Sequence, residues 1–199
     1  MSPTHPVRAS NGYYYTLMAL FPDKLQPGGG LCVMRTDRLD DPASWRAWDG
    51  RGFNLRLQSP YVSGRPAPLC TFLSTVRDVG YVVYSSHLER YMQIIPAHQW
   101  IDGRGVCGFY HALSADLVHW GDLHLIAEAK VWDGCETNLE PPGVLESVKV
   151  GYPSVLDHAD NTVNFERTGR TPHLYYVRFN QGAFDRDLVR VPLTFTRLD

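Results

Sequence analysis

The sequence predicts an all-β protein built from the four-stranded antiparallel sheets, or blades, of a β-propeller. The main observation is a phrase that occurs twice. Gly30-Leu31-Cys32 precedes Trp45, and Gly105-Val106-Cys107 precedes Trp120, with thirteen positions from cysteine to tryptophan in both copies and seventy-five positions between copies. Each copy combines a Gly-led apolar segment, a polar corner, a tryptophan and a second short strand. Repeated β units of this kind are typical of radially arranged sheets.

The polar corners are interpreted as structural. In the second copy, Asp116 is expected to accept hydrogen bonds from backbone N–H groups of a tight turn, while Leu117 and Trp120 point inward. In the first copy, the segment Asp40-Asp41-Pro42 is expected to form an equivalent turn, because proline pre-sets the backbone and aspartate caps it. These carboxylates are therefore interpreted as turn caps and not as catalysts.

The chain is expected to fold as one domain over residues 1–199, because no shift in composition marks a second one. About three blades are predicted, approximately over residues 5–50, 65–127 and 150–199. Their strands are assigned to β-prone segments bounded by turn residues: 12–20, 31–36, 69–76, 81–86, 106–113, 152–157, 173–179 and 188–195. The segment 88–95, before Pro96, gives a weak signal for a single helical turn.

The blade phrase resembles that of a known group of enzymes. The pattern Ser114-x-Asp116-Leu117-x-x-Trp120, after strands such as 12–15 and 173–176, is similar to the blades of the five-bladed glycoside hydrolase superfamily of arabinanases, β-xylosidases and fructosidases. The resemblance covers most of residues 5–195. It implies a polysaccharide or oligosaccharide ligand at one end of the propeller axis and an extracellular or periplasmic location, although residues 1–10 lack the pattern of a signal peptide.

The length of the chain limits how much of such a ring it can form. A closed five-bladed ring needs on the order of 300 residues, and closure protects strand edges from pairing elsewhere. The chain is therefore expected to be a fragment of a five-bladed ring, or an open array whose edges pair with missing blades or with another chain.

Three carboxylates are candidates for glycoside cleavage, which needs one carboxylic acid and a second carboxylate. The resemblance places them on or before an inner strand, with Glu136 or Glu140 as the acid and Asp157 as the base or orienting group. The sequence departs from the family where a glutamate usually precedes a proline, because the segment here reads His5-Pro6. The alternative is a non-catalytic carbohydrate-binding or scaffold propeller in which these acids cap turns.

Aromatic and basic side chains in loops and blade entries are candidates for saccharide binding. Flat amphipathic rings stack on sugar faces, and arginine or histidine can donate hydrogen bonds to hydroxyl groups. The predicted substrate-binding residues are Trp100, Trp132, Tyr152, His158 and Arg178.

Composition excludes several other classes of partner. A net charge of −2 and a pI near 6.4 give no field that would attract nucleic acid. No apolar segment is long enough for a membrane span, so no membrane partner is expected. The eight histidines do not follow the spacing of a metal site, and neither a metal nor another cofactor is expected.

The four cysteines lack a Cys-x-x-Cys pairing, and Cys32 and Cys107 begin equivalent strands. Buried free thiols are the leading interpretation, with a disulfide left open for Cys70 or Cys135.

Overall fold

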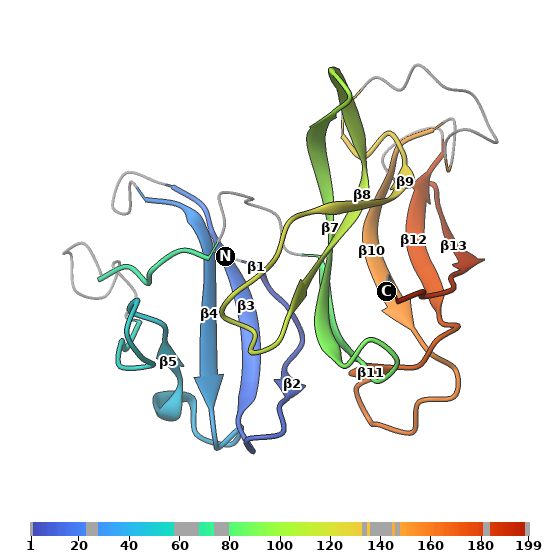
Figure 1. Cartoon of the computed structure of the whole chain (residues 1–199). Coiled ribbons are helices and arrows are strands. Elements are labelled where there is room, and N and C mark those ends of the chain that lie inside the picture. The colour runs from blue at the N-terminus through green and yellow to red at the C-terminus, as the bar shows by residue number, and fades with distance from the viewer. Residues whose placement is uncertain are drawn as a thin grey trace. The chain divides into compact units, whose positions relative to one another are not determined.

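The computed structural model describes residues 2–22, 28–57, 68–73, 80–132, 135, 145, 148–180 and 184–197. Within these residues the protein is all-β, as predicted, with one short 3-10 helix and no α-helix (Figure 1). No helix in the described part is long and apolar enough to cross a membrane. The chain divides into two compact units: residues 1–79 with 116–120, and residues 80–115 with 121–199.

The first unit contains one antiparallel sheet. Its strands are β1 (Ser2–Pro3), β2 (Val7–Arg8), β3 (Tyr14–Leu20), β4 (Gly30–Thr36) and β5 (Arg46–Ala47). They pair in the order β1-β3-β4-β5, with β2 also on β3. The central strands β3 and β4 are mostly apolar, and nearly all their residues are buried. The 3-10 helix η1 (Pro42–Ser44) links β4 to β5.

The second unit contains two sheets. The first has the order β11-β6-β7-β8-β9, formed by β6 (Tyr81–Ser85), β7 (Arg90–Ile101), β8 (Arg104–Ser114), β9 (His124–Glu128) and β11 (Arg167–Thr168). The second has the order β10-β12-β13, formed by β10 (Val150–Leu156), β12 (His173–Phe179) and β13 (Arg186–Pro192). All pairings in both sheets are antiparallel except that of β11 with β6.

The two sheets of the second unit share one hydrophobic core. Buried side chains of β6, β7 and β8 pack with side chains of β10 and β12: Val83, Met92, Ile94, Cys107, Phe109, Val150, Val155, Leu174 and Tyr176. The strand β13 alternates between half-buried and exposed residues, because only one of its faces meets this core. The other face of the β10-β12-β13 sheet carries the candidate site described below.

The predicted repeat is present as local structure. Asp41 Oδ1 accepts a hydrogen bond of 2.9 Å from Ala43 N, and Asp116 Oδ1 accepts one of 2.9 Å from Val118 N, with seventy-five positions between equivalent partners. Each corner follows an antiparallel hairpin, β3-β4 or β7-β8, and leads to a third strand, β5 or β9. The interpretation as a turn cap is confirmed for Asp41 and Asp116, whereas the exposed Asp40 lies only near Arg38, at 3.6 Å. The arrangement of the sheets as propeller blades remains a prediction.

Two expectations are wrong. The cysteines are not free, because Cys32 bonds to Cys70 and Cys107 bonds to Cys135, with Cα–Cα distances of 5.9 and 6.0 Å. Each compact unit thus holds one disulfide. Residues 90–95 form part of strand β7 and not a helical turn, because they pair with β6 on one side and β8 on the other. The strand continues through Pro96, beyond the last pairing with β6, where proline is tolerated.

Candidate functional site

Asp157, the predicted base or orienting group, caps a turn at the end of β10. Its Oδ1 accepts a hydrogen bond of 2.9 Å from Ala159 N, and its Oδ2 accepts one of 2.6 Å from Gly169 N. Partial burial acts to raise the pKa of this carboxyl, but the two backbone N–H groups, helped by His158 and His173, hold the pKa below its usual value. The carboxylate is therefore ionised, and both of its oxygens are engaged by the backbone.

The other two catalytic candidates, Glu136 and Glu140, lie outside the described residues. Within the described part of the chain, no group of three or more histidine, cysteine or acidic residues could hold a metal ion.

The structure brings three of the five predicted binding residues to one sheet. Tyr152 and Arg178 belong to β10 and β12, and His158 follows the end of β10. Trp100 lies near the tip of the β7-β8 hairpin, 75% exposed, with only an edge contact to His98 (6.0 Å between ring centroids) among the ring contacts of the described residues. Trp132 follows β9 and is partly exposed.

The site is the face of the β10-β12-β13 sheet that points away from the hydrophobic core. Successive side chains of a strand point to opposite faces, so burial of Leu174 and Tyr176 in the core turns the alternate residues of β12 outward. We call this surface the ring face, and it consists of Tyr152, His158, His173, Tyr175, Val177, Phe179 and Leu188.

One end of the ring face is a cluster of three polar rings. His158 stacks on His173 with 4.6 Å between centroids and 12° between planes, and His158 Nε2 lies 2.7 Å from Tyr175 Oη. His173 Nδ1 is buried and has no hydrogen-bond partner among the described residues. The cluster therefore presents rings that carry hydrogen-bonding groups, a combination suited to a polyhydroxylated ligand.

The other end is formed by two further rings. The ring of Phe179 lies beside Gly151, where an added Cβ would come within 3.3 Å of it. The Tyr152 ring is 6.1 Å from that of Phe179, between centroids. Arg186 and Lys149 place their charged groups 4.8 and 5.7 Å from the Phe179 centroid, which adds cation–π contacts.

Tyr152 is held in an unusual backbone conformation at a β-bulge. Its φ is +54°, in the left-handed region that non-glycine residues rarely adopt, and the register of β10 shifts between Gly151 and Ser154. The side chain is nevertheless 67% exposed, so burial of the ring does not repay the strain. Bulges and strained residues of this kind are concentrated at functional sites, where they direct a side chain.

Arg178 has a structural partner. Its Nη2 donates a hydrogen bond of 2.6 Å to Asp187 Oδ2, across the β12-β13 pairing, and Asn180 Nδ2 donates to the same oxygen at 3.0 Å. The hydrogen bonds from Asn180 and Arg178 lower the pKa of the Asp187 carboxyl. Arg178 shares the side of β12 that carries Leu174 and Tyr176, so this pair ties the two strands together on the face opposite the ring face.

Comparisons give no relative on which to base a function, because no family model, curated protein or solved structure matches the chain. The site therefore rests on its own geometry.

Sequence reasoning did not select His173, Tyr175 or Phe179 as site residues. The signal that could have identified them is their spacing of two, since His173, Tyr175 and Phe179 share one face of a strand whose intervening positions include Leu174 and Tyr176.

Proposed function

We propose that the protein is a carbohydrate-binding β-domain that holds an oligosaccharide or polysaccharide along the ring face. The observation that carries this proposal is the row of partly exposed rings on one side of β12, formed by His173, Tyr175 and Phe179. Six residue steps along β12 span about 20 Å, which is enough for several sugar units in a row. Rings offer apolar faces to the C–H groups of sugars, and the Tyr175 hydroxyl and the exposed ring of His158 can exchange hydrogen bonds with hydroxyl groups.

The resemblance of the blade phrase to five-bladed glycoside hydrolases supports the same ligand class, with arabinan, xylan and fructan as first candidates. It also supports the proposal that the sheets are blades of a propeller. The two disulfides support an oxidising compartment, in agreement with the extracellular or periplasmic location that the resemblance implies.

Binding without cleavage is the form of this function that the geometry favours. A glycosidase needs two carboxylates directed at one ligand. The carboxylate placed by the structure at this end of β10, that of Asp157, uses both oxygens to accept backbone N–H groups. We therefore assign Asp157 to the scaffold of the site.

The proposal is tested by calorimetric titration of the protein with oligosaccharides from arabinan, xylan and fructan. One of them is expected to bind, and Tyr152→Ala is expected to raise its Kd about 2- to 12-fold, because one ring contact contributes about 0.5–1.5 kcal/mol. Phe21→Ala is the matched control, because Phe21 is 47% exposed and belongs to the other compact unit. The absence of binding to all three, or equal affinity of Tyr152→Ala and wild type, refutes the proposal.

An assay for released reducing ends in the same samples separates binding from catalysis. No release above the rate without protein is expected. Release that depends on a carboxylate of this chain would support the glycosidase alternative.

A further inference from the structure

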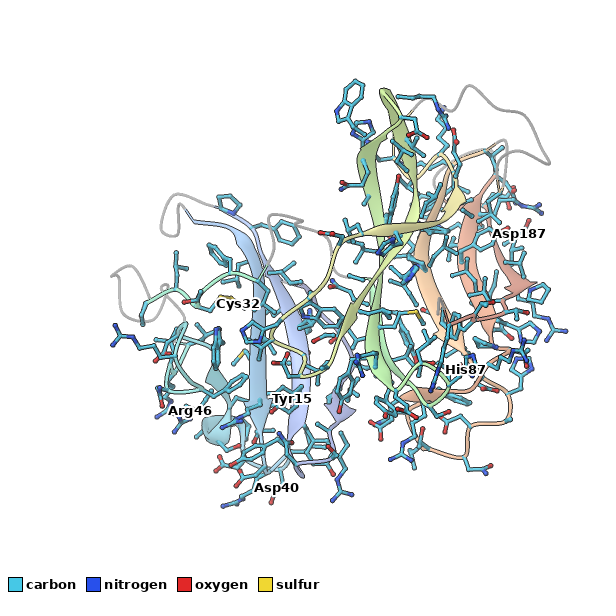
Figure 2. The ribbon with its side chains drawn as sticks, in the orientation of Figure 1. Tyr15, Cys32, Asp40, Arg46, His87 and Asp187 are labelled. Carbon is cyan, nitrogen blue, oxygen red and sulfur yellow. A yellow bond between two sulfur atoms is a disulfide. The ribbon has the colours of Figure 1, made fainter. Side chains whose placement is uncertain are left out.

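A polar hollow lies in the first compact unit, at the end of its sheet where β4 leads into η1. Figure 2 shows Tyr15, Asp40 and Arg46 toward this end of the sheet. The hollow has a volume of about 450 Å³ and is open to solvent. Its charged lining consists of three arginines and two aspartates: Arg35, Arg38, Arg46, Asp37 and Asp41.

Arg35 is held rigidly at the wall of this hollow. Its guanidinium carbon lies 4.2 Å from the ring centroid of Tyr13 and 4.2 Å from that of Phe53. Phe53 is itself fixed by ring contacts with Tyr15 and Trp48, at 5.6 and 5.2 Å between centroids. Two ring faces therefore set the plane of the guanidinium and leave the N–H groups at its edge to find partners.

Those N–H groups are largely unused. Among the described residues, Arg35 donates one long hydrogen bond, from Nη1 to Tyr15 Oη at 3.4 Å, and forms no ion pair. A guanidinium that is fixed between two rings and directs spare donors into a hollow open to solvent is pre-organised to bind an acceptor from solution.

Arg46 lies directly opposite Arg35 in the pairing of β4 with β5. Its Nη1 donates to the carbonyl oxygens of Ala43 and Trp45, at 2.7 and 2.9 Å, and it has no carboxylate partner in the described part of the chain. Like charges at directly paired positions destabilise a sheet. A ligand anion between the two guanidinium groups would offset that repulsion.

The aspartates near the hollow do not neutralise this pair. Asp41 caps η1 through Ala43 N and lies 4.0 Å from Arg38, and Asp40 lies 3.6 Å from Arg38. Asp37 is exposed and forms no ion pair among the described residues. Its carboxylate can only accept hydrogen bonds, so hydroxyl groups are the ligand chemistry that it suits.

We propose that this hollow binds a hydroxylated carboxylic acid of the uronic acid class. The ligand carboxylate takes the spare N–H groups of Arg35 and Arg46, whose planar forks match a carboxylate. A ligand hydroxyl donates to Asp37. The site is independent of the ring face, since it uses other residues in the other compact unit.

Titration of the full chain with galacturonate, galactose and inorganic phosphate tests this site. Galacturonate is expected to bind at least about tenfold more tightly than galactose or phosphate, because only it supplies a planar carboxylate together with hydroxyl groups. Arg46→Gln is expected to weaken galacturonate binding by at least about tenfold. Arg35→Lys is expected to do the same, because an ammonium group keeps the charge and loses the fork.

Arg38→Gln is the matched control, because it removes the same charge from the same hollow at an arginine that already has acidic neighbours. It is expected to change the affinity less than about twofold. A loss equal to that of Arg46→Gln would mean that only net charge matters and would overturn the proposal. Phosphate binding as tight as galacturonate, or no galacturonate binding, would overturn it as well.

Should Arg35→Lys fail to fold, as judged by circular dichroism, Arg46→Gln decides the question alone. Arg35→Lys and Arg46→Gln should bind the ring-face oligosaccharide with the affinity of wild type. A failure of the uronic acid proposal can therefore be distinguished from a failure of the ring-face proposal.

Discussion

The two disulfides give the most quantitative prediction for stability. Cys32–Cys70 and Cys107–Cys135 join residues 38 and 28 positions apart, and all four cysteines are buried. Loop-closure entropy of the unfolded chain gives about 3.9 kcal/mol for the first bond and about 3.6 kcal/mol for the second. Because each unit contains one bond, reduction is expected to lower the free energy of unfolding of each unit by an amount of this size.

The assay is urea unfolding of the oxidised and the reduced protein, followed by tryptophan fluorescence. Trp45, Trp48 and Trp120 belong to the first unit, and Trp100 and Trp132 belong to the second. Cys32→Ala/Cys70→Ala should lower the stability of the first unit and leave the second unchanged, and Cys107→Ala/Cys135→Ala should do the reverse. Thiol titration of the unfolded, unreduced protein should detect no free thiols.

Two results would refute this reasoning. Four free thiols in the protein as isolated from an oxidising compartment would mean that the bonds do not form. A loss below about 1 kcal/mol on reduction would mean that the bonds do not constrain the unfolded chain as loop closure requires.

Two further predictions concern aspartates that cap turns. In urea unfolding, Asp157→Asn is expected to lower the free energy of unfolding by about 2 kcal/mol. An amide has one acceptor oxygen, so its NH₂ group would face one of the two backbone N–H groups, such as that of Gly169. A loss of stability no larger than that of the exposed control Asp122→Asn would contradict the cap. For Asp116, partial burial acts to raise the pKa, but hydrogen bonds from the His119 side chain and from backbone N–H groups hold it at about 2. The folded pKa lies below the unfolded one, so this stabilisation is present above about pH 4 and is lost as the pH falls toward 2. After a discount for solvent exposure, this stabilisation amounts to about 1 kcal/mol. Plots of the free energy of unfolding against pH for wild type and Asp116→Ala should therefore converge as the pH falls from about 4 toward 2. Parallel plots would contradict the prediction.

The repeat could be predicted because its signal is local. Cys32 and Cys107, with Trp45 and Trp120, mark segments whose strands and corners depend on turn residues close in sequence. The three predicted blade ranges therefore contain most strands of the three sheets.

Features that depend on contacts between distant segments were harder to predict. The disulfides join each Gly-led strand to a cysteine that lies outside the strands, so spacing alone did not pair Cys70 or Cys135 with its partner. The strand predicted over 69–76 is wrong for its described part, because residues 69–73 form no strand. The apolar run 88–95 suits a short helix as well as a strand, and only pairing on both sides fixes it as β7. Asp157 was placed correctly at the end of a strand, but its engagement by Gly169 depends on a segment twelve residues away.

In the ring face too, single residues could be predicted from local sequence, but their assembly could not. Tyr152 and His158 were predicted as single residues in a blade entry. Their assembly with His173, Tyr175 and Phe179 into one face follows from the pairing of β10 with β12, which sequence periodicity does not determine.

The most direct test of saccharide binding at the ring face is an aromatic NMR titration of the labelled protein with the oligosaccharide that binds it. Ring signals of Tyr152, His158, Tyr175 and Phe179 should shift together along one binding curve, while those of the exposed Trp100 stay in place. Shifts confined to Trp100 or to the first compact unit, with the ring-face signals unchanged, would contradict the account.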